Sequence, residues 1–242
     1  MSTPDDLVFL LDVDDTLLDN DRFGDDLAAR LERDFGASER DRYHALYEAR
    51  RDEVGYADYL GALQAFRDGN DREDQLLQMS GFLLDYPFAE RLYPRALEAI
   101  AHLRTLGTVG ILSDGDIVFQ PRKIHRAGLW DAVDGKVLVY VHKERMLDAM
   151  QRHFPASHYV MVDDKPKLLA AMKRVLGDRL TTVFVRQGHY AAASDNASVT
   201  PPPDHAIAHI GDLCNLTMSD IRTLAHATGD SSLRTAAAPE AS

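Results

Sequence analysis

A short apolar run near the N-terminus, from Leu7 to Leu11, is followed at once by acidic residues. Five consecutive apolar residues are too few for a free-standing helix, but they suit a parallel strand buried on both faces. Asp12, Asp14 and Asp15 then place three carboxylates at the end of that strand. Such negative charge is costly unless cations or hydrogen-bond donors compensate it. We therefore interpret this stretch as the candidate active site.

The letters DVDDTL, from Asp12 to Leu17, resemble the first signature of the haloacid dehalogenase superfamily. That signature is an Asp-x-Asp-x-Thr loop after the first strand of a Rossmann-like core, and most members transfer phosphoryl groups through an aspartyl-phosphate. The resemblance implies that Asp12 is the nucleophile, that Asp14 is the general acid/base, and that Thr16 fixes the loop.

The chain from residue 93 onward alternates between helical and strand patterns. Helical spacing of apolar residues predicts helices over 94–106, 117–127, 146–154 and 166–176. Short apolar runs predict strands over 109–112, 137–141, 158–162, 181–185 and 206–210. Repeated alternation implies parallel strands with right-handed crossovers and helices on both faces. We predict an α/β fold with a Rossmann-like, doubly wound parallel sheet as its core.

The segment between residues 18 and 92 shows helical periodicity and no strand pattern. We predict an all-helical domain at 18–92, inserted into a catalytic core formed by 1–17 and 93–226. The small and polar residues at 227–242 predict a disordered tail. The resemblance implies that the helical domain is a cap covering the active site. The alternative is a helical subdomain without a catalytic role.

Polar residues follow four of the predicted strands at the points where those strands end. In a doubly wound sheet, ligands bind beyond the carboxyl ends of the strands, so these side chains should meet at one edge. As an ordered set they resemble all four signatures of the superfamily over residues 7–185. The set consists of Asp12, Asp14, Ser113, Asp114, Gly115, Lys143, Asp163 and Asp164.

The acidic members of this set predict a magnesium site. Clustered carboxylates repel one another unless a hard divalent cation holds them together, and Mg²⁺ prefers oxygen ligands. The resemblance implies that the Asp12 side chain, the Asp14 main-chain carbonyl and Asp164 bind Mg²⁺ directly. Asp163 would act beside them, through a water. The alternative for Asp163 and Asp164 is a turn and helix N-cap before Pro166.

The remaining members of the set are expected to bind phosphate. Phosphoryl transfer needs positive charge and donors around the equatorial oxygens. Ser113 can offer its hydroxyl, and Asp114 and Gly115 can offer main-chain N–H groups. Lys143 can supply a cation and keep the nucleophile ionised. Lys136 precedes its strand and should therefore lie at the opposite edge.

Other polar residues lie outside this set. The ten histidines show no metal-ligand spacing such as HExxH, so we interpret them as surface or packing residues. Several polar residues of the helical segment could contact a substrate, although a solvated helix face is the simpler explanation for each: Asn20, Arg22, Arg50, Arg51 and Tyr86.

Composition excludes several classes of function. The net charge of −12 argues against nonspecific binding to nucleic acid or to anionic membranes, which needs basic patches. The single Cys214 excludes an intramolecular disulfide and a cysteine-rich zinc site. No apolar run approaches the ~18 residues of a membrane span, and no signal-peptide pattern opens the chain. We expect a cytoplasmic monomer or homodimer whose partner is a small phosphorylated substrate.

Asp14 distinguishes between the reactions known in the resembled superfamily. Hydrolysis of a phosphate ester requires a proton for the leaving alkoxide and then an activated water, so a second carboxylate is needed. Halide leaves without a proton, and dehalogenases of this type lack an acid at that position. We predict a Mg²⁺-dependent phosphatase. The alternatives are a sugar-phosphate mutase, a 2-haloacid dehalogenase-type hydrolase and a catalytically silent binding protein on the same fold.

Overall fold

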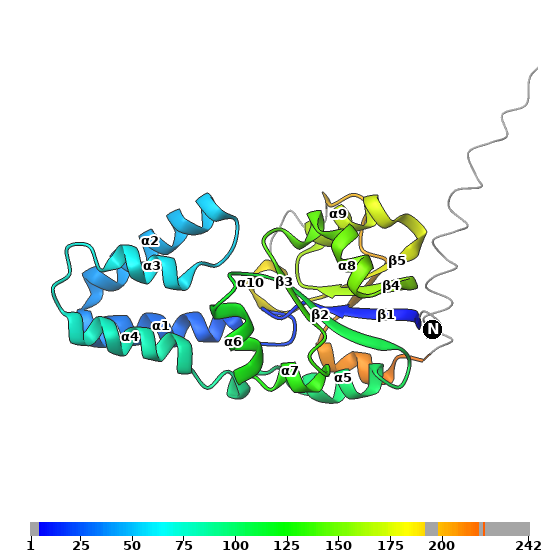
Figure 1. Cartoon of the computed structure of the whole chain (residues 1–242), viewed down its shortest axis with the longest axis horizontal. Coiled ribbons are helices and arrows are strands. Elements are labelled where there is room, and N and C mark those ends of the chain that lie inside the picture. The colour runs from blue at the N-terminus through cyan, green and yellow to red at the C-terminus, as the bar shows by residue number, and fades with distance from the viewer. Residues whose placement is uncertain (1–4, 192–197, 218–219, 221–242) are drawn as a thin grey trace, which may run out of the picture.

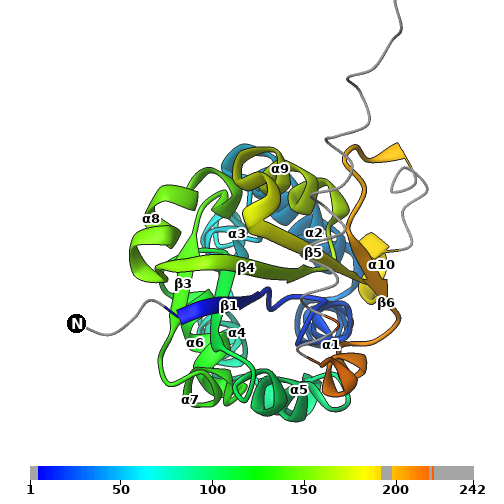
Figure 2. The same ribbon diagram turned by 90° about the vertical axis from the view of Figure 1, so that its right-hand side faces the viewer.

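The strand that precedes the acidic residues, β1, lies inside a sheet of parallel strands in the order β3-β2-β1-β4-β5-β6 (Figures 1 and 2). This computed structural model describes residues 5–191, 198–217 and 220, so the predicted tail at 227–242 lies outside the described residues. The sheet confirms the predicted α/β class and the parallel direction of its strands. The strands are β1 (Asp5–Leu11), β2 (Thr108–Asp114), β3 (Val137–Tyr140), β4 (Ala156–Asp163), β5 (Leu180–Val185) and β6 (His205–Ile207).

The side chains of β1 alternate between two apolar clusters, one on each face of the sheet. Leu7, Phe9 and Leu11 belong to one cluster, and Val8 and Leu10 belong to the other. Helices α8 (Leu147–His153) and α9 (Pro166–Leu176) cover one face, and α5 (Ala96–Leu103) and α7 (Leu129–Ala132) cover the other (Figures 1 and 2). The prediction that this strand is buried on both faces is confirmed.

Several element boundaries differ from the predicted ones. Helix α5 begins at Ala96 and not at Pro94, because Arg95 adopts a left-handed conformation with φ +65°. Helix α6 spans Phe119–Arg126, so it begins two residues after the predicted start at residue 117. The side chain of Asp116 accepts hydrogen bonds from the N–H groups of residues 118 and 119 at this start. Strand β6 ends at Ile207, and 3₁₀ helix η5 occupies Ile210–Asn215. The predicted strand at 206–210 was therefore too long.

The helices between β1 and α5 lie together beyond the carboxyl ends of the strands (Figure 1). The chain leaves and returns to the sheet at one place, since Leu18 forms a β-bridge with Leu92 and the N–H of Tyr93 donates to the carbonyl of Leu17 over 2.9 Å. None of the described helices is long and apolar enough to cross a membrane. The segment contains α1 (Asn20–Phe35), α2 (Ala37–Val54), α3 (Tyr59–Phe66), α4 (Glu73–Asp85) and the 3₁₀ helix η1 (Phe88–Arg91).

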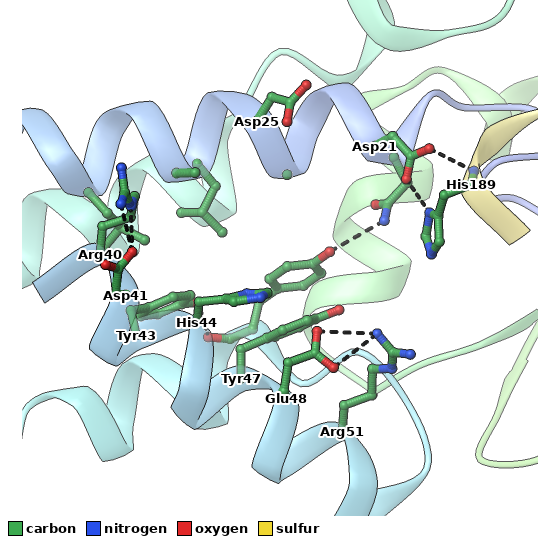
Figure 3. Close-up of a pocket in the computed structure, with 16 residues that line it drawn as sticks. Asp21, Asp25, Arg40, Asp41, Tyr43, His44, Tyr47, Glu48, Arg51 and His189 are labelled. Atoms are coloured by element: carbon green, nitrogen blue, oxygen red, sulfur yellow. Dashed lines mark hydrogen bonds and ion pairs between the residues drawn. The ribbon is translucent and has the colours of Figure 1, made fainter. Parts of the chain in front are cut away.

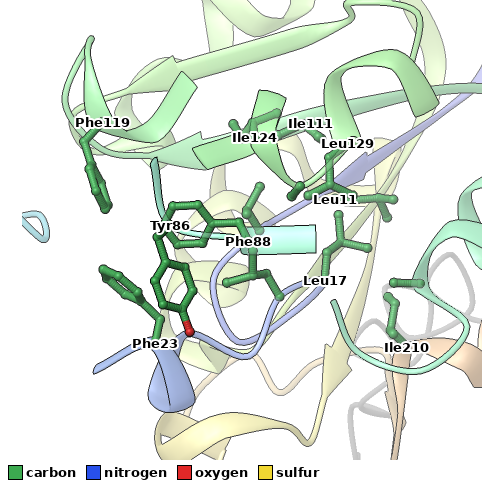
Figure 4. Packing of buried hydrophobic residues seen from close by; sticks show 14 of the residues in the cluster. Leu11, Leu17, Phe23, Tyr86, Phe88, Ile111, Phe119, Ile124, Leu129 and Ile210 are labelled. Carbon is green, nitrogen blue, oxygen red and sulfur yellow. The ribbon is translucent and has the colours of Figure 1, made fainter. Parts of the chain in front are cut away.

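Aromatic rings join this helical segment to the sheet layer. Phe23 on α1 packs against Tyr86 and Phe88 with ring centroids 4.9 and 5.1 Å away, and Phe119 of α6 closes the group at 6.0 Å (Figure 4). All four rings are buried. The apolar core is consequently continuous from the sheet into the base of α1, so the first turn of that helix is held firmly next to the carboxyl edge.

Candidate active site

The carboxyl ends of the central strands bring the predicted polar residues together. Asp12 follows β1, Ser113 is the residue before the last one of β2, and Asp163 ends β4. Lys143 begins the 3₁₀ helix η2 (Lys143–Arg145), which follows β3 after a left-handed residue, His142, redirects the chain. The side chains of Asp12, Ser113, Lys143, Asp163 and Asp164 are all buried. Their convergence follows from the parallel register, because each strand ends at the same edge.

Lys143 lies at the centre of this group. Its ammonium donates to Oδ1 of Asp12 and to the carbonyl of Leu112, the latter over 3.1 Å, and it lies 2.7 Å from Oδ2 of Asp163. Burial opposes the charge of Lys143, but Asp12 and Asp163 outweigh burial and raise its pKa above the ordinary value. Lys136, by contrast, lies at the start of β3, where its ammonium is 3.5 Å from Asp134. Lys143 is therefore the lysine that the structure places beside Asp12.

The buried carboxylates have the properties of a cation site. Asp12, Asp163 and Asp164 each offer an oxygen within 4.8 Å of the other two. Among the described residues, no hydrogen-bond donor reaches Oδ2 of Asp12 or either oxygen of Asp164. Buried oxygens without partners are destabilising, and three carboxylates provide the hard ligands that Mg²⁺ prefers. The donor set therefore fits a divalent cation.

The side chain of Asp163 makes more polar contacts than that of Asp164. Its Oδ1 accepts from the N–H of Lys165 over 2.8 Å, and its Oδ2 faces Lys143. Helix α9 begins at Pro166 with no side-chain cap. The N-cap alternative for the two aspartates is therefore wrong for α9, although Asp163 does form a local turn. Asp164, whose oxygens accept no hydrogen bond from the part of the chain that the structure describes, is the better placed of the two to hold a cation.

Two of these carboxyl groups, Asp12 and Asp164, have pKa values raised above the ordinary range. Burial raises the pKa of Asp12 to about 7, with Lys143 opposing the rise and Asp163 adding to it. Burial raises the pKa of Asp164 to about 9, against the opposing charge of Lys165. Both shifts measure how poorly the protein alone compensates these negative charges. A bound cation would compensate them.

Asp14 is held by residues that the sequence did not single out. Its Oδ1 accepts from the ammonium of Lys123 over 2.7 Å, and its Oδ2 accepts from the side-chain amide of Gln120 over 3.2 Å. The same amide donates to the hydroxyl of Ser113 over 3.0 Å. Lys123 and Gln120 are three residues apart on α6, so both point from one face of that helix. No local signal marks them, because the stretch reads as an ordinary basic helix.

The remaining predicted site residues have distinct surroundings. Asp114 is half-buried and accepts from the N–H of Lys143 over 2.7 Å. The N–H of Gly115 donates to the carbonyl of Tyr140 over 2.9 Å, so in this structure it is not free for a phosphate oxygen, contrary to the prediction. Thr16 is fully buried, and its carbonyl accepts from Gln187 over 3.0 Å. This contact holds the acidic loop through the backbone of Thr16.

Asp15, the third aspartate of the acidic string, makes hydrogen bonds to the backbone of the neighbouring helix. Oδ1 of Asp15 accepts from the N–H groups of Asn20 and Asp21 over 3.0 and 3.2 Å, which ties the loop to the start of α1. Burial and the nearby Asp21 raise the pKa of Asp15 to about 6. His189, in α10 (Gly188–Ala191), donates its N–H to Asp21 over 2.8 Å. This histidine therefore packs α10 against α1, in agreement with a packing role.

A cavity of about 450 Å³ opens over this edge and is lined by Asp14, Asp114 and Lys165. A second cavity, of about 490 Å³, lies between α1 and α2 and shares Asn20, Tyr47, Arg51 and His189 with the first (Figure 3). Asn20 and Arg51 were among the candidate contacts of the helical segment. Two other candidates are engaged within that segment, since Arg50 pairs with Asp58 and Tyr86 pairs with Asp26.

Residues 7–175 match the sequence profile of the haloacid dehalogenase-like hydrolases. A crystal structure from Burkholderia xenovorans LB400, assigned to the same hydrolases, is 57% identical, covers 88% of this chain and 100% of its own, and superposes with a TM-score of 0.84. A comparison with curated protein sequences finds no match.

More distant solved structures share the fold. The L-2-haloacid dehalogenase of Xanthobacter autotrophicus with covalently bound chloropropionic acid is 20% identical, with 86% and 97% of the two chains covered and a TM-score of 0.57. YfnB of Bacillus subtilis bound to magnesium is 18% identical, with 86% and 98% covered and a TM-score of 0.57. At these identities the likeness concerns the architecture alone.

Proposed function

Because this chain belongs to the haloacid dehalogenase-like hydrolases, we propose that it hydrolyses a small phosphomonoester with Mg²⁺ bound beside Asp12. One observation carries the proposal: the carboxylate of Asp14 lines the cavity two residues after Asp12. An alkoxide leaving group needs a proton, and halide does not. A second carboxylate at this position therefore supports phosphate-ester chemistry over dehalogenation.

In the proposed reaction Asp12 attacks phosphorus, so that an oxygen–phosphorus bond forms to Asp12 and the ester bond to the alcohol breaks. Asp14 gives its proton to the departing alkoxide oxygen and later takes one from the water that hydrolyses the aspartyl-phosphate. Lys143 offsets the negative charge that accumulates beside Asp12. Ser113 lies at the same edge and offers a hydroxyl to the phosphoryl oxygens.

Asp12 and Asp164 would hold the cation, and the Asp14 main-chain carbonyl and Asp163 would complete its surroundings. When bound, Mg²⁺ supplies positive charge to the phosphoryl oxygens. The helical segment α1–α4 would serve as the cap, since its residues line the cavity opposite α9.

The direct test is a screen of purified protein against phosphomonoesters and 2-haloacids, with Mg²⁺ and with EDTA. We expect release of inorganic phosphate that depends on Mg²⁺, and no release of halide. Halide release without phosphatase activity would replace this proposal by the dehalogenase alternative. Transfer of phosphate to a sugar hydroxyl in preference to water would replace it by the mutase alternative.

Replacing Asp14 with Asn should slow hydrolysis of alkyl phosphates by about 10²-fold or more, the usual scale for a lost general acid/base. Aryl phosphates should lose less, because their leaving groups depart without a proton. The comparison is made by steady-state kinetics on both ester types at one pH. An equal loss on the two types would remove the general-acid role from Asp14.

Mg²⁺ is expected to raise the melting temperature of the protein. A cation that binds only the folded state stabilises it by mass action, and here it would relieve repulsion among buried carboxylates. Thermal denaturation across a Mg²⁺ titration should show the rise in wild type and a smaller one in Asp164→Ala. The exposed Asp178, at the opposite end of the sheet, offers the matched control, Asp178→Ala. A melting temperature indifferent to Mg²⁺ up to tens of millimolar would contradict the site.

A further inference from the structure

Lys123 on α6 is a charged side chain in an unusually apolar place. Its side chain is completely buried. Four aromatic rings surround its ammonium, with centroids 5.2 to 5.8 Å away: Phe23, Tyr59, Phe88 and Phe119. Figure 4 shows three of these rings, which come from α1, η1 and α6. The faces of aromatic rings attract a cation, so this box holds the ammonium as well as excluding water from it.

The ammonium makes two polar contacts inside the box. It donates to Oδ1 of Asp14 over 2.7 Å and to the side-chain oxygen of Asn20 over 3.0 Å. Asn20 is the first residue of α1, and its side-chain amide in turn donates to the hydroxyl of Tyr59 over 3.3 Å. Lys123 therefore links the acidic loop to the base of the helical segment through a single buried group.

We propose that Lys123 is a positioning residue that fixes the orientation of the Asp14 carboxylate in the cavity. The proposal rests on the proposed role of Asp14 as general acid/base. Lys123 anchors Oδ1 and Gln120 anchors Oδ2, so the plane of the carboxylate is set from one face of α6. A proton is transferred efficiently only along a well-aligned path, so losing one anchor should slow the steps that need the proton.

Stability alone is a weak reason for an ammonium in this box. A buried ion pair loses hydration that its mutual attraction repays incompletely, so replacing the whole pair with apolar side chains often costs little, whereas removing one member leaves the other charge uncompensated. Asp14 lines the cavity and 19% of its side chain is exposed, so water can hydrate its carboxylate in a Lys123 variant. Methionine is unbranched and packs well against aromatic rings, so Lys123→Met should fill the box and fold. What that variant loses is the donor to Asp14.

The test is a double-mutant cycle between Lys123→Met and Asp14→Asn, measured with alkyl and aryl phosphates. Lys123→Met should lower kcat for alkyl phosphates by about tenfold or more, with a smaller loss for aryl phosphates and KM within about twofold. In the Asp14→Asn background it should cost no more than about twofold further, because both changes remove one function. Lys136→Met, at the opposite edge, is the matched control and should retain wild-type rates.

Other outcomes would overturn the proposal. Equal losses on both esters, or losses that multiply in the double variant, would make Lys123 a purely structural residue. If Lys123→Met does not fold, Lys123→Gln retains a polar donor and should show a milder form of the same leaving-group dependence. Failure of the proposed function is recognised separately, because wild type would then hydrolyse neither ester. A crystal structure of Lys123→Met would still decide the matter, since an Asp14 side chain in its original position contradicts the proposal.

Discussion

Replacing Asp12 with Asn is expected to abolish turnover of every phosphomonoester that the wild-type protein accepts. The amide cannot form the bond to phosphorus, and it removes one of the negative ligands proposed for the cation. Losing a covalent nucleophile lowers kcat by about 10⁴-fold or more. Acid quenching of the wild type during turnover of a labelled substrate should trap phosphoprotein, and the variant should trap none.

The fold should survive this substitution, which keeps the result interpretable. Asn has the shape of Asp, and Lys143 retains Asp163 as a charged partner 2.7 Å away. The matched control is Asp178→Asn, an exposed position that should keep wild-type activity. Near-normal turnover by Asp12→Asn, or trapped phosphate on that variant, would mean that another residue is the nucleophile.

The second large effect is expected for Lys143→Met. Without the ammonium, Asp12 and Asp163 lose the lysine that contacts both of them, and they repel each other and a bound phosphate more strongly. Binding and transfer should both weaken, and kcat/KM should fall by about 10²-fold or more, as when a preorganised electrostatic contact is lost. Steady-state kinetics over a range of substrate concentrations separate the two contributions.

Lys136→Met provides the comparison for this prediction within the same strand. Lys136 precedes β3 and lies 3.5 Å from Asp134, 41% of its side chain is exposed, and its replacement should change kcat/KM little. If Lys136→Met lost more activity than Lys143→Met, the direction of β3 relative to the site would be wrong.

Much of the fold could be predicted because β1 imposes strong requirements. A strand apolar at every position must have neighbours on both sides and layers on both faces, and Leu7, Val8 and Phe9 do alternate between two clusters. The convergence of Asp12, Lys143 and Asp163 followed from parallel direction alone. The order of the strands could not be predicted in this way, because the spacing of apolar residues does not indicate which strands pair.

The surroundings of Asp14 show why the rest could not be predicted. Lys123 lies on a short helix with two arginines and one histidine, where a solvated lysine is the ordinary interpretation. Its burial depends on Phe23 and Tyr59, which are distant in the chain and reach it only after the helical segment has packed. The N–H of Gly115 is likewise occupied by a residue distant in the chain, because it donates to the carbonyl of Tyr140. Contacts between residues that are distant in the chain cannot be predicted from the spacing of neighbouring residues.

The central place of β1 also determines when the protein can begin to fold during synthesis. Its hydrogen-bonding partners are residues 108–111 on one side and 156–162 on the other. Until both segments have left the ribosome, the apolar strand β1 lacks its pairing partners. The intervening helices can already form from local contacts during that time. We therefore expect a stage in which the helices have formed while the first strand is still exposed, and unpaired apolar strands promote aggregation.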